Sequence, residues 1–273
     1  MNLEKSISVG IVTYYTDRSL DLDLNLHILN KTLSYLNNHT YIGKVILIDN
    51  SPKSFSFAID TGLEKVEYIY QNGLNHGFGK GHNIVSKYID SYRYHLILNP
   101  DVSFDNKSDC ISTLVDFLET NDTAVMVQPL IVDYRSNKII RTCKKNPTFI
   151  IQFIRGFCPK GLLPIWKRYN DWYEMSDVAY RKKYIESQYL SGSFMLCKKK
   201  ALDSIGWFDE SYFLYLEDAD LTRMLSSIGR CIHYPEEFIR HLWNRGSHRN
   251  LFHRWQAIKS FIIYTLKWGL KIL

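Results

Sequence analysis

Short apolar runs alternate along this chain with longer stretches in which apolar positions recur at helical spacing. The runs predict strands at residues 7–12, 45–48, 66–70, 95–98 and 124–128. The helically spaced stretches predict helices at residues 23–38, 80–92 and 111–118. Because strands and helices alternate in this order, we expect an α/β fold with a mainly parallel central sheet and helices on both of its faces.

The second half of the chain has a different character. Residues 141–188 crowd Arg, Lys and aromatic residues together without a regular period, which indicates a partly helical insertion and not a second domain. The pattern then predicts strands at residues 188–197 and 230–234, and helices at residues 199–205 and 217–228. We therefore expect one domain over residues 1–250, carrying this insertion, followed by an amphipathic helix over residues 251–273.

The tail combines an apolar stripe with basic residues. Six apolar positions recur at helical spacing: Leu251, Trp255, Ile258, Ile262, Leu266 and Leu270. Four basic residues accompany them: Arg254, Lys259, Lys267 and Lys271. This pattern suits a helix that lies on an anionic bilayer surface. A core or dimer helix with a solvated basic face is the alternative.

Composition narrows the class of protein. The 273 residues carry a net charge of +6, which is too weak by itself to indicate a nucleic-acid partner. No apolar stretch of about 20 residues predicts a spanning helix, and no secretory signal is visible. The scattered cysteines, never in a CxxC, are typical of reduced thiols in a cytosolic protein: Cys110, Cys143, Cys158, Cys197 and Cys231. We expect a cytoplasmic protein, peripheral at the inner face of the plasma membrane.

Acidic residues follow two of the predicted strands. The run at 95–98 ends in Asn99-Pro100-Asp101, and Pro100 must stop the strand because it has no N–H to donate. The carboxyl ends of strands form the ligand-binding edge of an open α/β sheet, and a carboxylate there suits Mg²⁺ or Mn²⁺. Asp49 ends the second strand, where an acid can bind a base or a ribose. For both sites a simple polar turn is the alternative.

Two later segments also carry candidate chemistry. Residues 76–83 (HGFGKGHN) form a glycine-rich turn into a helix, whose free N–H groups suit an anion, although close packing would explain the glycines equally well. Residues 208–223 (FDESYFLYLEDADLTR) cluster four acids near aromatic residues: Asp209, Glu217, Asp218 and Asp220. A helix dipole accounts for one or two of these acids. His241, after the last strand, would be a metal ligand if it lies within reach of Asp101.

Taken together, these pieces resemble the family-2, GT-A-type glycosyltransferases. The resemblance rests on the order of ILIDNS, NHGFGKGHN, LILNPD, SGSFML and FDESYFLYLEDADL, followed by a late histidine, and covers about residues 7–250. Within the family, the chain is most similar to bacterial rhamnosyltransferases that build surface polysaccharides, such as O-antigen or capsule, on a polyprenyl-diphosphate lipid. The resemblance implies a GT-A fold with a Rossmann-like sheet.

The resemblance also implies roles for individual residues. Asp101 and His241 match the metal ligands for Mg²⁺ or Mn²⁺, and Asn99 replaces the first acid of the family's DxD motif. Asp218 matches the general base. Asp49 matches the acid that binds the nucleotide base, and with it the donor side comprises Thr13, Asp49, Asn75, Gly77, Asn83 and Asn99. The acceptor side comprises Gly192, Ser193 and Glu217.

The expected reaction is an inverting sugar transfer. A divalent cation would offset charge on the leaving diphosphate, and a carboxylate on the opposite face would take the proton from the acceptor hydroxyl. The resemblance favours L-rhamnose, from dTDP-L-rhamnose, as the sugar and a polyprenyl-diphosphate-linked glycan as the acceptor. A UDP-hexose or UDP-GlcNAc donor is the alternative within the family. A catalytically silent nucleotide-binding subunit of a polysaccharide assembly complex is the alternative from another class, favoured only by Asn99.

Overall fold

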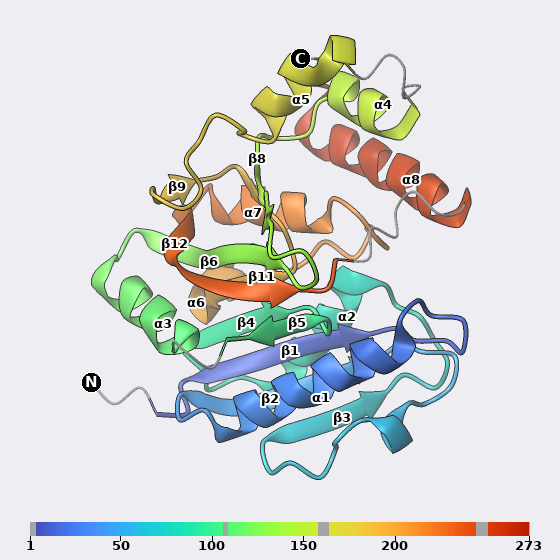
Figure 1. The fold of residues 1–273 in the computed structure, drawn as a ribbon, viewed down its shortest axis with the longest axis vertical. Helices are drawn as coiled ribbons and strands as arrows, with labels where there is room; N and C mark the ends of the chain where they lie inside the picture. The colour runs from blue at the N-terminus through green and yellow to red at the C-terminus, as the bar shows by residue number, and fades with distance from the viewer. Residues whose placement is uncertain (1–3, 106–108, 158–163, 244–250, 273) are drawn as a thin grey trace.

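The computed structural model describes residues 4–105, 109–157, 164–243 and 251–272. Ten strands of the described chain form one sheet, in which eight follow the order β3-β2-β1-β4-β11-β6-β12-β5, with β7 beside β6 and β9 beside β12 (Figure 1). The strands on that path are β1 (Ile7–Thr13), β2 (Ile42–Asp49), β3 (Val66–Tyr70), β4 (Tyr94–Leu98), β5 (Val102–Phe104), β6 (Ala124–Asp133), β11 (Phe194–Lys198) and β12 (Arg230–His241). The two flanking strands are β7 (Ile139–Ile140) and β9 (Ile185–Glu186).

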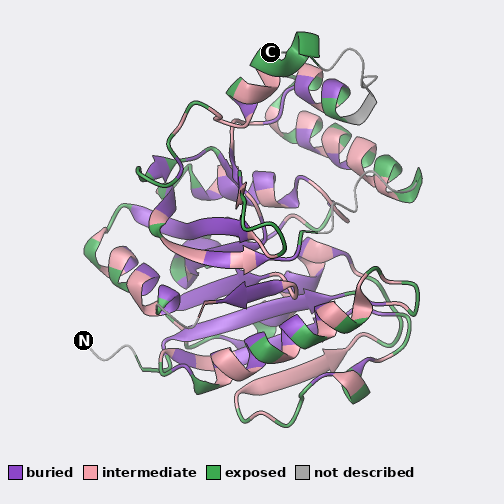
Figure 2. Ribbon diagram, in the orientation of Figure 1, coloured by how far each residue is buried: buried purple, intermediate pink, exposed green. Residues whose placement is uncertain are grey.

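The first four strands of the sheet order, β3, β2, β1 and β4, run parallel, as their intervening helices require. Helices α1 (Leu22–Asn38) and α3 (Cys110–Thr120) bury their apolar positions against one face of the sheet. Helices α2 (Phe78–Val85), α6 (Lys199–Ile205) and α7 (Glu217–Leu225) cover the other face. The central strands β1, β4, β6 and β11 are almost wholly buried, whereas the edge strand β3 is half-buried (Figure 2). The predicted α/β fold with a mainly parallel sheet is therefore confirmed.

The sheet also contains antiparallel pairs that the alternation of elements did not indicate. β11 runs antiparallel to both β4 and β6. The single strand predicted over residues 188–197 is divided, because a turn at residues 191–193 separates β10 (Tyr189–Leu190) from β11. β10 pairs instead with β8 (Cys143–Lys144) in a small second sheet. This division leaves the turn at 191–193 projecting between the two sheets.

Strand β12 is longer than predicted. The pattern ends the strand at residue 234, yet β12 continues to His241 past a register shift around Pro235. Its far end pairs with β5, a short strand that the sequence reading missed, and the register sets His241 opposite Val102. The extension matters for the site, because Val102 directly follows Asp101.

The basic and aromatic insertion contains β8, β9, α4 (Phe149–Phe157) and α5 (Lys167–Tyr173). Helix α8 (Leu251–Trp268) lies beside α4 (Figure 1). The N–H of Phe149 donates to the carbonyl of Lys271 at 2.8 Å, and the rings of Phe149 and Phe261 lie 6.1 Å apart. The predicted C-terminal helix is thus present. It ends at Trp268, before the predicted end at residue 273, which lies outside the described residues.

None of the helices in the described ranges is long and apolar enough to cross a membrane. Four of the cysteines are buried and free: Cys110, Cys143, Cys197 and Cys231. Cys158 lies outside the described residues.

Candidate active site

The carboxyl end of β4 and the far end of β12 meet at one point. Nε2 of His241 lies 3.0 Å from Oδ1 of Asp101 and 3.4 Å from Nδ2 of Asn99. The pairing of β12 with β5 fixes this meeting, and the N–H of Leu242 donates to the carbonyl of Asp101 at 2.9 Å. The three predicted side chains therefore converge. Over the described residues, no group of three or more His, Cys, Asp or Glu side chains could hold a metal.

Asp49 occupies the end of β2 and is completely buried. Its Oδ1 accepts from the hydroxyl of Thr13 at 3.2 Å and from the N–H of Ser51 at 3.0 Å. Its Oδ2 accepts from the N–H of Phe55 at 3.2 Å and from the hydroxyl of Tyr68. With four donors, the carboxylate holds the loop after β2 against β1 and β3. Its predicted contact with a nucleotide base stays a prediction.

The glycine-rich turn before α2 forms the next part of this edge. Oδ1 of Asn75 accepts from the N–H of Gly77 at 2.9 Å, and the carbonyl of Gly77 accepts from the side-chain amide of Asn50 at 3.0 Å. Gly77 has φ +77°, and a Cβ there would lie 2.1 Å from the carbonyl oxygen of Phe213. Only glycine fits this position, because both the backbone angle and the space exclude a side chain.

Asn83 lies further along α2, and its side chain links this helix to the segment around Phe208. Its amide donates to the carbonyl of Phe208 at 2.8 Å, and its Oδ1 accepts from the N–H of Phe208 at 3.1 Å. These two bonds connect α2 to the segment that carries the acidic motif. In this structure the predicted donor-binding residue Asn83 therefore supports the neighbouring loop.

The turn at 191–193 joins the two sides of the site. The N–H of Asn99 donates to the carbonyl of Ser193 at 3.0 Å, and the N–H of Gly192 donates to Oδ2 of Asp218 at 3.0 Å. A Cβ on Gly192 would lie 3.2 Å from Cβ of Asp218. The hydroxyl of Ser193 is buried without a partner among the described residues. This turn brings Asp218 to the same end of the sheet as Asn99.

Helix α8 contacts two of the four acids of the 208–223 motif and leaves the other two without a hydrogen bond or ion pair from it among the described residues. Nζ of Lys267 lies 2.9 Å from Asp209 and 2.8 Å from Asp220, and the indole N–H of Trp268 donates to Asp220 at 2.6 Å. Asp209 and Asp220 are therefore occupied by the C-terminal helix. Asp218 and Glu217 remain, and they lie next to the turn at 191–193.

Both remaining acids have raised pKa values. Burial, together with the charge of Asp218, raises the pKa of Glu217 to about 8, while Oε2 of Glu217 has no partner among the described residues. Burial also raises the pKa of Asp218, although the charge of Lys144 and the N–H groups of Gly192 and Ala219 oppose this shift. A carboxylate with a raised pKa accepts a proton more readily, as a general base must.

Tyr15 belongs to the site but was not singled out from the sequence. Its side chain is 5% exposed and its hydroxyl is buried without a partner among the described residues. Burial raises its pKa, and the charges of Asp101 and Asp49 raise it further. The hydroxyl thus faces the strand ends. Its place directly after the first strand, two positions past Thr13, was the available signal.

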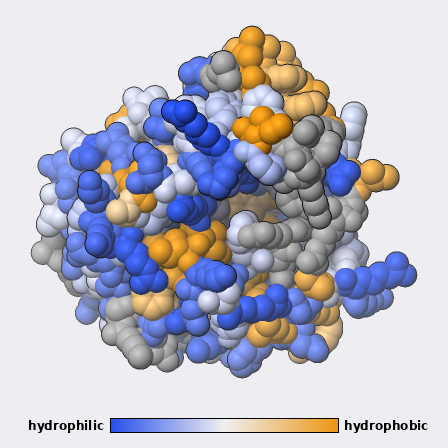
Figure 3. Space-filling model, turned by 45° about the horizontal axis from the view of Figure 1, so that its top comes forward, coloured by the Kyte–Doolittle hydropathy of each residue, from blue (hydrophilic) through white to orange (hydrophobic). Residues whose placement is uncertain are grey.

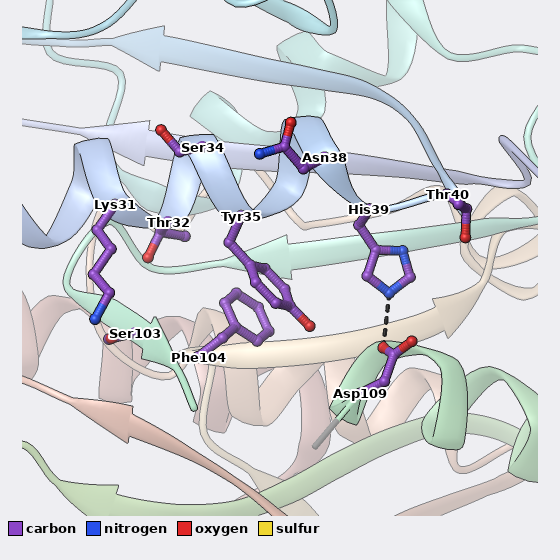
Figure 4. Close-up of a pocket in the computed structure, with 10 residues that line it drawn as sticks. All are labelled: Lys31, Thr32, Ser34, Tyr35, Asn38, His39, Thr40, Ser103, Phe104 and Asp109. Atoms are coloured by element: carbon purple, nitrogen blue, oxygen red, sulfur yellow. Dashed lines mark hydrogen bonds and ion pairs between the residues drawn. The ribbon is translucent and has the colours of Figure 1, made fainter. Parts of the chain in front are cut away.

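A cavity of about 680 Å³ lies between α1, β5 and the start of α3, and none of the predicted site residues lines it (Figure 4). His39 bonds Asp109 across it at 2.8 Å, and the ring of Tyr35 stacks on Phe104 at 4.5 Å. Asp109 also caps α3 by accepting from the N–H of Ser112. These contacts fasten α1 to β5 and to the start of α3.

Comparison with known proteins bears on this arrangement. No family model matches the chain. Over 252 residues it is 28% identical to the rhamnosyltransferase WbbL of Escherichia coli (strain K12), covering 89% of this chain and 85% of the relative. Over 139 residues it is 33% identical to the N-acetylglucosaminyl-diphospho-decaprenol L-rhamnosyltransferase of Mycobacterium tuberculosis, covering 49% of this chain and 41% of the relative.

Solved structures agree in fold. The mannosyltransferase PcManGT of Pyrobaculum calidifontis, in complex with GDP-Man and Mn²⁺, superposes with a TM-score of 0.60 at 16% identity, over 96% of this chain and 64% of that one. GalNAc-T7 with UDP, GalNAc and Mn²⁺ superposes with a TM-score of 0.59 at 14% identity, over 88% of this chain and 43% of that one. The chain has the GT-A glycosyltransferase fold. The predicted resemblance to rhamnosyltransferases and the predicted enzyme class, glycosyltransferase, are confirmed.

Proposed function

We propose that this GT-A protein transfers a sugar, L-rhamnose from dTDP-L-rhamnose, to a polyprenyl-diphosphate-linked glycan with inversion at the anomeric carbon. The observation that carries the proposal is the turn at 191–193, which contacts Asn99 on one side and Asp218 on the other. A donor diphosphate near Asp101 and an acceptor hydroxyl near Asp218 would then lie on opposite sides of the reacting carbon. The two rhamnosyltransferase relatives support the choice of sugar.

The donor side fits a divalent cation. Asp101, His241 and Asn99 offer a carboxylate, an imidazole and an amide within one cluster. Mg²⁺ and Mn²⁺ sites use few protein ligands and complete their shell with water and substrate phosphates. When bound, the cation would offset the negative charge that grows on the departing diphosphate. Asp101 and His241 would hold it, and Asn99 would take the place of a second carboxylate.

Asp218 is the general base in this proposal. Its Oδ2 accepts from Gly192 and, at 3.3 Å, from the hydroxyl of Tyr189, and its Oδ1 accepts from the N–H of Ala219 at 2.9 Å. These bonds aim the carboxylate while leaving it lone pairs for the proton of the acceptor hydroxyl. A single displacement inverts the anomeric carbon, because no second nucleophile is required.

The acceptor implies a membrane surface, and the apolar stripe of α8 supports one. Helix α8 packs inward through Ser260, Phe261, Tyr264 and Trp268. The opposite face leaves large apolar side chains exposed: Leu251 at 83%, Trp255 at 63%, Ile262 at 52%, Leu266 at 82% and, just past the helix, Leu270 at 59%. Orange hydrophobic side chains gather at the upper edge of the molecule, the end where α4, α5 and α8 lie (Figure 3). We assign this stripe to peripheral attachment at an anionic bilayer.

A donor panel tests the proposal. Purified protein with Mg²⁺ or Mn²⁺ is given dTDP-L-rhamnose, a UDP-hexose or UDP-GlcNAc, and a synthetic prenyl-diphosphate-linked N-acetylglucosamine as acceptor. We expect transfer from dTDP-L-rhamnose and an inverted linkage by NMR. If the protein transfers sugar only from a UDP-linked donor, that donor replaces dTDP-L-rhamnose in the proposal. The absence of both transfer and donor hydrolysis with every donor would favour the catalytically silent subunit.

A further inference from the structure

Lys144 lies beside the proposed base, in a part of the chain that the mechanism above does not use. The register of the small sheet sets Lys144 directly opposite Tyr189. Nζ of Lys144 lies 4.7 Å from the centre of the Tyr189 ring, and the hydroxyl of that ring donates to Asp218 at 3.3 Å. A single tyrosine therefore connects the ammonium group to the catalytic carboxylate.

Among the described residues, no direct ion pair neutralises the charge of Lys144. Arg155, on α4 nearby, is already paired, because its Nη1 lies 2.6 Å from Glu174 and 3.0 Å from the side chain of Asn170. No carboxylate of the described residues forms an ion pair with Lys144. Burial lowers the pKa of Lys144, as does the charge of Arg155, while the charge of Asp218 raises it. A cation that is partly desolvated and unpaired is suited to a ligand anion.

An apolar surface continues from this point. Five positions after Lys144 the chain enters α4, whose Phe149 and Phe153 are 47% and 55% exposed. The ring of Phe149 lies 6.1 Å from Phe261 on the inward side of α8, so α4 packs beside that helix. Asp218, Lys144 and α4 are thus linked in the order in which sugar, diphosphate and lipid follow one another in the acceptor.

We infer that Lys144 binds the diphosphate of the lipid-linked acceptor, with the acceptor sugar over Tyr189 and its hydroxyl at Asp218. The inference rests on the proposed function and deepens it, since it assigns the residue that recognises the acceptor. No bond to the diphosphate forms or breaks in the transfer. Lys144 contributes only binding energy and positioning. It places the sugar so that one hydroxyl contacts Asp218.

Two variants and two acceptors test this role. Lys144→Met removes the charge and keeps an apolar stem. Lys145→Met is the matched control, because Lys145 lines a separate cavity of about 260 Å³ with Met175, Glu186 and Ser226. The acceptors are a prenyl-diphosphate-linked N-acetylglucosamine and the same sugar on a neutral alkyl chain. We expect Lys144→Met to raise KM for the diphosphate acceptor at least tenfold with little change in kcat, and Lys144→Arg to restore it.

Four results would overturn the inference. One is an unchanged KM in Lys144→Met, and another is an equal loss with the neutral acceptor, which would mean that Lys144 acts through Asp218. A third is weaker binding of dTDP by Lys144→Met in calorimetry, which would assign Lys144 to the donor diphosphate. Should the wild type transfer nothing, the proposed function fails separately. Calorimetry with the diphosphate acceptor then decides about Lys144, and equal binding by wild type and Lys144→Met is the fourth overturning result.

Discussion

The proposed donor edge and the proposed acceptor wall of this protein hold their acids in different ways. At the donor edge, formed by the ends of β1, β2 and β4, Asp49 is buried and accepts four hydrogen bonds. At the acceptor wall, formed by β8, β10, α7 and α8, Glu217 is buried with one oxygen unpartnered and Asp218 has a raised pKa. A saturated carboxylate supports the backbone around it. Glu217 keeps affinity for a proton because it is buried with an oxygen that lacks a donor, and Asp218 keeps it because burial outweighs the three hydrogen bonds that it accepts.

Both regions join parts of the chain that are distant in sequence. Thr13 and Asp49 are paired by adjacent parallel strands. Asp218 accepts hydrogen bonds from Gly192 and Tyr189, 26 and 29 positions away, whereas Asp101 and His241 at the donor edge are 140 positions apart. In the proposed mechanism, donor binding falls on strand ends held by sheet pairing, and proton transfer falls on a carboxylate held by a turn. The predictions below address each side in turn.

The largest effect is expected at the donor edge. Asp101→Ala removes the carboxylate that faces His241, so a divalent cation loses its charged ligand. We expect transfer to fall by on the order of 10³-fold or more and the Mn²⁺-dependent part of nucleotide-sugar affinity to vanish in calorimetry. Asp17→Ala, an acid with 82% side-chain exposure, is the control and should change neither. A nucleotide-sugar affinity that changes neither on addition of EDTA nor in Asp101→Ala would contradict the metal site.

Asp218→Asn tests the acceptor wall. It keeps the size and polarity of the side chain and removes its basicity, so we expect transfer to fall by about 10²–10⁴-fold while donor affinity stays nearly unchanged. Initial rates measure the transfer, and calorimetry with the nucleotide sugar measures the donor affinity. The same measurements are made on Glu217→Gln and Asp220→Asn. The base would have to be reassigned if Asp218→Asn turns over normally while either of these two variants is inactive.

A smaller effect is expected where the acceptor wall meets the bilayer. The double variant Leu266→Ser and Leu270→Ser removes two exposed leucines, so binding to anionic liposomes should weaken by about tenfold or more. The matched control replaces Leu20 and Leu74, which are 47% and 61% exposed elsewhere, with serine. Flotation measures both, and wild-type binding should fall as salt rises. Equal flotation of the two double variants would argue against the stripe.

The smallest effect concerns the stability of the wall itself. The pKa of Glu217 rises from an ordinary 4.5 to about 8 on folding, so the protonated side chain favours the fold. This contribution is complete below about pH 4.5 and is lost as the pH rises through about 8. Glu217→Gln lacks the titration, and its Tm should exceed that of the wild type by a few degrees at pH 9 relative to pH 5. Parallel Tm curves of the wild type and Glu217→Gln would refute a buried protonated Glu217.

The sequence by itself determined the main strands and helices and the ends that carry polar residues, but it missed the short strand β5. Apolar runs ending in Asp49 or in Asn99-Pro100-Asp101 predicted strands with acids at their carboxyl ends, because strand length and proline are local constraints. The helical spacing of Leu251 to Leu270 likewise predicted α8 and its apolar stripe. The core reading of that stripe is wrong, since its leucines are exposed while Tyr264 and Ser260 face inward.

Only the tertiary structure decided which residues meet. Asp101 and His241 are 140 positions apart and touch because β12 runs on past Pro235 to pair with the unpredicted strand β5. Periodicity could not rank the four acids of the 208–223 motif, and Lys267 did so by pairing with two of them. The physical reason is that periodicity reports which face of an element is buried, whereas the partner of a buried charge depends on how distant elements pack.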